Sequence, residues 1–168
     1  NPDNSNPKSP KFGSNTSGNN LAEIVFTTNS NQQKIFLTQI ELRFNPAKRN
    51  LSSELDLDHI IHAAIRGMDQ ATLEYGVKAC LIFCLAREFD HKLNSIIVDK
   101  AIKYRHRGVL GIDLAGTESH ALELKPDVVA QYEDLFERAR KAGLKATVHT
   151  GETRGTGAEG VIAVIDKL

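Results

Sequence analysis

The sequence lacks features that would direct the protein to a membrane or to a polyanion. Its 21 basic and 21 acidic residues cancel, so no broad field favours nucleic acid or an anionic surface. No run reaches the roughly 18 apolar residues of a membrane span, and the first residues do not resemble a secretory signal. We therefore expect a cytoplasmic protein that recognises its partners at a defined site, with neither nucleic acid nor membrane among them.

Cysteine is also scarce, and its pattern argues against redox chemistry. The two cysteines, Cys80 and Cys84, both lie in the apolar stretch ACLIFCLA, at a spacing that differs from the C-x-x-C of dithiol enzymes. Thiols in such a stretch are typical of a buried strand. This pattern favours a reducing compartment and no disulfide.

Composition divides the chain near residue 20. Asn, Ser, Pro and Gly dominate residues 1–20, which offer almost nothing to bury, so we predict a disordered leader there. The chain as a whole is 40% hydrophobic and 25% charged, which is enough for one packed core. We therefore expect residues 21–168 to form a single domain.

Apolar patterning predicts strands that alternate with helices after a short opening pair of strands. The opening runs at 23–28 and 34–44 suit a hairpin or two successive strands, the second of which ends near Asn45. The elements expected after them are a helix over 53–75, a strand over 77–86, a helix over 91–107, a strand over 108–116, a helix from Pro126 to Gly143, a strand with its exit loop over 145–152, and a helix from Ala158.

This alternation predicts an α/β fold with parallel strands joined by right-handed crossovers. Either an open doubly wound sheet or part of a closed TIM-type (β/α) barrel would satisfy it. No glycine-rich phosphate loop follows the first strand, and GIDLAG is not a dinucleotide fingerprint. The pattern therefore favours a partial barrel over a nucleotide-cofactor fold.

Polar residues gather where the predicted strands end, and in a parallel barrel these ends share one face. They are Arg43, Arg87, Asp113, Gly116, His149 and Glu152. For the two arginines we favour buried ion pairs or loop anchors over direct catalysis. Asp113, set between apolar neighbours, is equally consistent with a structural pairing and with a substrate contact.

His149 and Glu152 make the strongest pair of candidates. A histidine that ends an apolar strand can be a satisfied core residue. With a glutamate three positions later, however, a metal-ligating nitrogen and a proton-transferring carboxylate reach the same mouth of the barrel.

Three segments together resemble one known family. RGVLGIDLAGTE is followed about thirty residues later by GLKATVHTGE, and IELRFNP precedes both. In this order they resemble the adenosine deaminase family of the amidohydrolase superfamily, over roughly Lys34 to Leu168. The resemblance implies a zinc-containing (β/α) barrel that hydrolytically removes the 6-amino group of adenosine or a related adenine nucleoside or nucleotide.

The resemblance also implies roles for single residues. His149 would be a zinc ligand, and the zinc would lower the pKa of a bound water. Glu152 would be the catalytic residue that protonates purine N1 and assists the departure of ammonia. The backbone N–H of Gly116 would bond purine N3, and Asp113 is a further candidate for substrate binding.

The chain departs from the family pattern in what it lacks. The family has metal-binding motifs that this sequence lacks: the His-x-His of the first barrel strand, the histidine of the sixth strand and the aspartate of the last strand. We therefore expect that the first and last barrel strands are missing. One histidine does not hold a catalytic zinc, which normally needs three protein ligands. His59 and His62 have chelating spacing, but we interpret them as solvated or packed surface residues of a helix.

Two functions therefore remain open. In the first, the chain derives from a purine deaminase and is inactive in isolation, as a fragment, a truncated product or a half-barrel that another chain completes. In the second, it is a non-catalytic remnant or interaction module that pairs, or self-associates, through exposed strand edges. A third alternative, an open doubly wound binding protein, would make His149 and Glu152 coincidental.

Overall fold

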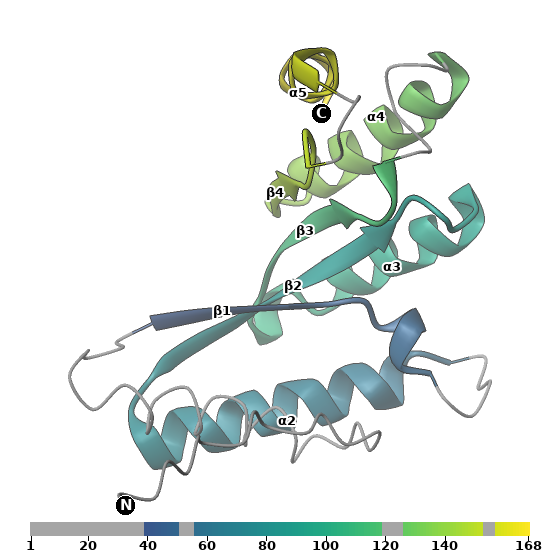
Figure 1. Cartoon of the computed structure of the whole chain (residues 1–168). Helices are drawn as coiled ribbons and strands as arrows, with labels where there is room; N and C mark the ends of the chain where they lie inside the picture. The colour runs from purple at the N-terminus through teal and green to yellow at the C-terminus, as the bar shows by residue number, and fades with distance from the viewer. Residues whose placement is uncertain (1–38, 51–55, 119–125, 153–156) are drawn as a thin grey trace, which may run out of the picture.

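The computed structural model describes residues 39–50, 56–118, 126–152 and 157–168, in which strands and helices alternate along the chain (Figure 1). The elements are β1 (Gln39–Phe44), η1 (Ala47–Arg49), α2 (Asp58–Tyr75), β2 (Lys78–Ala86), α3 (His91–Lys103), η2 (Arg105–Arg107), β3 (Val109–Ala115), α4 (Pro126–Lys141), β4 (Lys145–Val148) and α5 (Gly157–Lys167). The predicted leader over 1–20 and the predicted strand over 23–28 lie outside the described residues.

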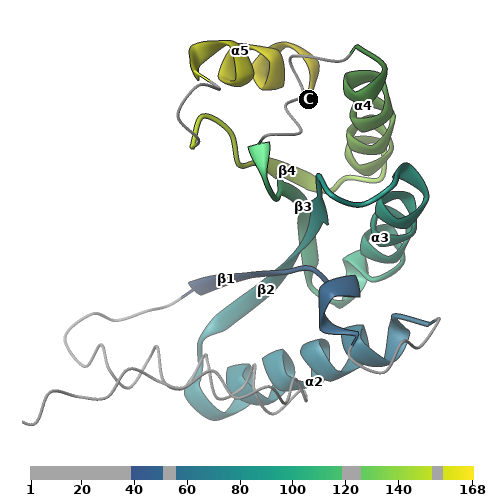
Figure 2. The same cartoon turned by 45° about the vertical axis from the view of Figure 1, so that its right-hand side comes forward.

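The described strands form one parallel sheet in the order β1-β2-β3-β4. Each strand is joined to the next by a helical crossover, and Figure 2 shows α2, α3 and α4 along one side of the curved sheet. Neighbouring strands that follow one another in sequence are the arrangement of a (β/α) barrel, whereas a doubly wound sheet reverses its order at a switch point. The prediction of a partial barrel is confirmed.

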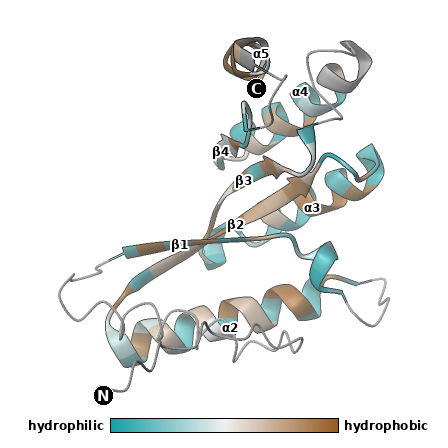
Figure 3. Cartoon of the chain, in the orientation of Figure 1, coloured by the Kyte–Doolittle hydropathy of each residue, from teal (hydrophilic) through white to brown (hydrophobic). Residues whose placement is uncertain are grey.

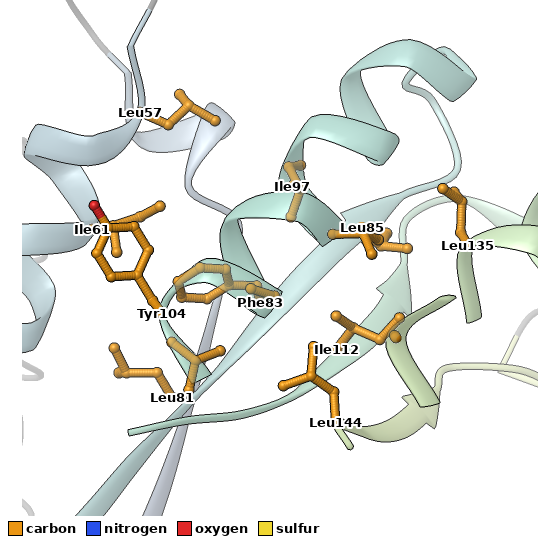
Figure 4. Close-up of a cluster of buried hydrophobic side chains, with 14 of the residues drawn as sticks. Leu57, Ile61, Leu81, Phe83, Leu85, Ile97, Tyr104, Ile112, Leu135 and Leu144 are labelled. Carbon is orange, nitrogen blue, oxygen red and sulfur yellow. The ribbon is translucent and has the colours of Figure 1, made fainter. Parts of the chain in front are cut away.

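The core lies between the sheet and these helices. On β2, Leu81, Phe83 and Leu85 are fully buried and join the main hydrophobic cluster with residues of α2, α3 and α4 (Figure 4). Burial of each such side chain contributes on the order of 1.5–3 kcal/mol. Because side chains alternate along a strand, Ile82 and Cys84 point to the opposite face, which leads to the candidate site.

Helix ends follow local sequence signals. Gly76 ends α2 with a φ of 67°, a left-handed conformation that glycine adopts without steric cost. The side chain of Asp90 caps α3 by accepting a hydrogen bond from the backbone N–H of Leu93.

The predicted helix over 91–107 was too long at its end. The structure ends α3 at Lys103 and continues with the separate 3-10 turn η2. The chain must reverse here to enter β3, and the backbone N–H of Val109 bonds the carbonyl of Tyr104 across that turn. The amphipathic pattern of residues 91–107 predicted one helix, but the tertiary path decided where α3 ends.

Hydrophobic residues concentrate in the strands, in α2 and in α5 (Figure 3). In α5, Val164 packs against the core, whereas Ile162 and Ile165 are exposed. Within the described ranges, no helix combines the length and the apolar character that crossing a membrane requires.

Candidate functional site at the carboxyl ends of the strands

The side chain of Asp113 on β3 connects all four described strands. It is completely buried, and the hydroxyl of Thr147 donates to its Oδ1 at 2.7 Å. Nδ1 of His149 lies 3.1 Å from Oδ1 and 3.0 Å from Oδ2. The guanidinium of Arg43 lies 3.5 Å from Oδ2, and the thiol of Cys84 donates to the same oxygen at 3.5 Å.

The parallel register explains this convergence. Cys84 on β2 pairs with Asp113, and Asp113 pairs with Thr147 on β4, so the three side chains form one row across the sheet. The first residues beyond β4 place His149 next to that row, and its backbone N–H bonds the carbonyl of Leu114. A buried carboxylate is costly unless it is paired, and here its partners supply both charge and hydrogen bonds.

These contacts define the protonation of the neighbouring groups. A carboxylate only accepts hydrogen bonds, so the proton of a neutral His149 ring resides on Nδ1, leaving Nε2 with its lone pair. Burial and then the nearby negative charge of Asp113 raise the pKa of the Cys84 thiol to about 12. Cys84 is therefore a neutral hydrogen-bond donor at physiological pH.

Arg87 anchors the exit loops, as the sequence predicted. Its guanidinium is buried and donates to the carbonyl of Gly116 at 3.2 Å and to the carbonyl of His149. One side chain at the end of β2 thus joins the ends of β3 and β4. Arg43 forms the predicted ion pair, although its side chain is half exposed.

Gly116 follows β3 in a conformation that only glycine adopts readily, with a φ of 103°. A Cβ at this position would collide with the carboxylate of Glu88, which lies directly against the glycine. Glu88 in turn forms an ion pair with Lys48 from η1. The backbone around Gly116 is therefore bounded by an acidic side chain from the neighbouring loop.

The structure brings some of the predicted residues together and separates others. Asp113 contacts His149 directly, and Arg87 links His149 to Gly116 through their carbonyls. Glu152 is exposed on the loop that leaves β4, three positions beyond His149.

The sequence did not predict Glu88, Lys48 or Cys84 as residues of this site. Glu88 directly follows a strand-end arginine and Lys48 lies in η1, a few residues after the end of β1, so polar residues just beyond a strand end are also candidates for such a site.

The described residues could supply a single metal ligand but do not form a complete metal centre. Asp113 holds Nδ1 of His149, which fixes the orientation of the ring and leaves the lone pair of Nε2 available to a ligand. In the described part of the chain, no group of three or more His, Cys, Asp or Glu side chains could hold a metal ion. His62 faces the hydroxyl of Tyr104 at 2.8 Å, and Nδ1 of His59 faces the carbonyl of Asp56 at 2.7 Å. These two histidines are the packed surface residues that the sequence predicted.

Comparison with known proteins shows the family of this chain. The family model described as adenosine deaminase matches residues 15–168. The adenosine deaminase of Clostridium kluyveri is 36% identical over 114 residues, which cover 68% of this chain and 31% of that protein. An adenosine deaminase of Clostridium perfringens is 32% identical over 136 residues, covering 80% of this chain and 38% of that protein.

Solved structures agree on the fold. An amidohydrolase from Burkholderia ambifaria with bound zinc superimposes with a TM-score of 0.72 at 25% identity, over 90% of this chain and 40% of that one. The N6-mAMP deaminase of Arabidopsis superimposes with a TM-score of 0.68 at 22% identity, over 90% of this chain and 44% of that one, which supports the fold alone. The chain thus spans less than half the length of these relatives. The family-model match, which includes both Asp113 and His149, shows that the chain belongs to the adenosine deaminase family.

Proposed function

We propose that this chain contributes the substrate-facing ends of β3 and β4 to a zinc-dependent hydrolytic deaminase. Its substrate is adenosine or a related adenine nucleoside or nucleotide, and its products are the inosine-type compound and ammonia. Family membership supports the reaction class, and the contact between Asp113 and His149 is the observation that carries the site assignment.

In this proposal His149 supplies one ligand to the metal through Nε2. Asp113 accepts the hydrogen bond from Nδ1 and so holds the ring in one tautomer and one orientation, while Arg87 fixes the backbone of His149. When bound, zinc supplies Lewis-acid activation of the attacking water. The described residues contain no group of three or more donors, so this proposal requires His149 to be one part of a larger donor set.

Glu152 and Gly116 act on the purine. The carboxyl group of Glu152 donates a proton to ring N1 as negative charge develops there, and then assists the departure of ammonia. The backbone N–H of Gly116 bonds N3, and the lack of a side chain at Gly116 permits close approach of the ring. Asp113 stays a candidate for a polar substrate contact in addition to its role in orienting His149.

The first experiment follows the ultraviolet change from adenosine to inosine with the purified chain, added zinc and a series of protein concentrations. We expect no turnover from isolated chains. Activity that rises more steeply than concentration would mean that chains complete one another's sites.

A chimera tests the reaction class itself. Residues 39–168 replace the matching segment of the Clostridium kluyveri adenosine deaminase, and circular dichroism verifies that the chimera is folded. Deamination of adenosine by the chimera, and its loss when His149 becomes alanine, is the expected result. A folded chimera that binds no adenosine contradicts the proposal.

The edges of the sheet favour a second candidate function. β1 and β4 are the outer strands of the described sheet, and Lys145, Ala146 and Thr147 on β4 are exposed. Strand edges that no described strand covers can recruit further strands, so in this candidate function the chain acts as an interaction module or self-associates. Light scattering over a concentration series tests this candidate, and a chain that stays monomeric throughout would exclude self-association.

A further inference from the structure

We propose that a second copy of this chain completes the barrel. Two copies related by a two-fold axis along the centre of the barrel place β4 of each beside β1 of the other, so that one closed sheet results. The mouth that the copies then share deepens the proposed function and rests on it, whereas the dimer depends on the fold alone.

The described sheet has the strand order and the curvature of half a TIM-type barrel. Its four parallel strands follow one another in the order β1-β2-β3-β4, and Figure 2 shows a curved sheet with α2, α3 and α4 along one side. A TIM-type barrel consists of eight parallel strands inside a ring of helices. A two-fold axis along the barrel preserves strand direction, so two copies supply all of these strands and leave no open edge.

The strand register permits this closure. Arg43, Ile82, Gly111 and Lys145 form one row across the described strands. The row falls from near the carboxyl end of β1 to the first residue of β4. A TIM-type barrel shifts its register by about one residue per strand, or about four residues over half a barrel. The row therefore continues at Gln39 on β1 of the second copy, and an even shift keeps interior residues in the interior.

The interior faces of the two edge strands carry opposite charges. Arg43 on β1 and Thr147 on β4 both reach Asp113, so Glu41 and Lys145, two positions before them, face the same interior. Both side chains are exposed, and within the described ranges neither forms an ion pair.

Closure buries these two charges, and a buried charge is costly unless it is paired. With Lys145 beside Gln39 of the second copy, Glu41 of that copy is its diagonal neighbour. Diagonal neighbours on one face of a sheet lie about 7–8 Å apart, which two long side chains can span. The two-fold axis forms the pair twice, so the charges of one chain satisfy those of its copy. This self-complementarity favours a second copy over an unrelated partner.

The helix layer offers apolar surface at the same edge. In α5, Val164 packs against the core, while Ile162 and Ile165 are exposed. Ala146, on the helix side of β4, is exposed as well. In the dimer, β1 of the second copy brings its Leu42, which is half-buried in one chain, under α5. Apolar burial then adds to the pairing of the strands.

The closed barrel has a single mouth to which both copies contribute. The carboxyl ends of all strands share one face, so each copy adds one His149 held by its own Asp113. The interior of an eight-stranded barrel is just wide enough for side chains to fill, which brings the two rings to opposite sides of one narrow opening. The second imidazole enlarges the donor set that the proposed function requires.

Charge reversal tests the dimer by sedimentation equilibrium of the full chain. We expect the wild type to dimerise. Glu41→Lys and Lys145→Glu should each raise the dimer Kd at least about a hundredfold, because like charges then meet at both contacts. An equimolar mixture of the two variants should dimerise with a Kd within about tenfold of the wild type, since each contact again joins opposite charges. Asp99→Lys, on α3 over the inner strands β2 and β3, should leave the Kd unchanged.

The outcomes separate the dimer from the proposed function. A wild type that stays monomeric, or that forms open-ended aggregates, overturns the closed barrel. Dimers that survive the single charge reversals, or a mixture of the variants that stays monomeric, overturn it too, because the contact would then lie elsewhere. If the dimer forms as expected but neither binds nor deaminates adenosine, the proposed function fails and the closed barrel stands. Circular dichroism of each variant distinguishes loss of the dimer from loss of folding.

Discussion

Nδ1 of His149 lies 3.0 Å from Oδ2 of Asp113, although the two residues are 36 positions apart in the chain. The same carboxylate accepts from Thr147 and Cys84 and pairs with Arg43. Asp113 thus links the ends of the four described strands and also orients the candidate metal ligand, His149.

Replacing Asp113 with asparagine should destabilise the fold. Asn keeps the shape but loses the charge that pairs Arg43, and its N–H₂ group faces donors, so we expect a loss of about 1–3 kcal/mol in the free energy of unfolding. Urea denaturation measures it. Asp69→Asn is the control, because its ion pair with Arg107 is half exposed and contributes less than about 1 kcal/mol. Equal losses in the two variants would show that the Asp113 network contributes no more than a surface pair.

Replacing Glu152 with glutamine should remove turnover without weakening substrate binding. Glutamine has nearly the same shape but cannot transfer a proton, so the deamination rate of the active chimera should fall about 10²- to 10⁴-fold. Adenosine binding measured by dialysis should stay within about twofold of the parent. Deamination at the parental rate would remove Glu152 from the mechanism.

Phe83→Ala should be among the most destabilising core substitutions. The ring is fully buried and packs edge to face against Phe44, with ring centroids 5.4 Å apart. Loss of the ring and the cavity left behind should cost about 3–5 kcal/mol. Leu73→Ala is the matched control, because Leu73 is 87% exposed and its removal should change stability by less than about 0.5 kcal/mol. Denaturation midpoints that coincide for the two variants would contradict the described core.

Asp58 should contribute a stability that disappears in acid. Partial burial raises its pKa, but hydrogen bonds from Lys100 and Lys103 outweigh this and lower the pKa from 3.8 to about 2. Because the pKa of Asp58 is lower in the folded than in the unfolded chain, its ionised carboxylate stabilises the fold at pH values above about 4. This stabilisation is lost as the pH falls from about 4 to about 2. Because solvent screens the charge of Asp58, we expect its contribution to the free energy of unfolding to be on the order of 1 kcal/mol. Asp58→Asn should lose that amount at pH 7 and almost nothing near pH 2, and a pH-independent difference would refute this assignment.

Cys84 should resist alkylation in the folded chain. Only the thiolate reacts readily, and burial together with the charge of Asp113 raises the pKa of Cys84 to about 12. Iodoacetamide at pH 8, followed by peptide mass spectrometry, should label Cys84 much more slowly in the native chain than in urea. In Asp113→Asn the labelling of Cys84 should accelerate, whereas that of Cys80 should not. An unchanged Cys84 rate in that variant would contradict the role of the carboxylate.

Much of the fold could be predicted because its signals are local. The apolar run of β2, the helical spacing of α2 and the glycine stop at Gly76 each depend on neighbouring residues, and the structure confirms them. The end of α3 could not be predicted in this way, since the reversal into β3 depends on a contact between Tyr104 and Val109 that the tertiary path imposes.

The sequence by itself determined which residue types arrive at the ends of parallel strands, because strand length and alternation decide where each polar side chain emerges. Only the tertiary structure decided their partners. Strand register placed Cys84, Asp113 and Thr147 in one row, and Arg87 reached the carbonyl of His149 across 62 positions. Sheet twist and loop packing placed Glu88 against Gly116. Such pairings depend on distances of a few ångströms between segments far apart in the chain, and the free energy of the whole packed sheet, not any local pattern, sets those distances.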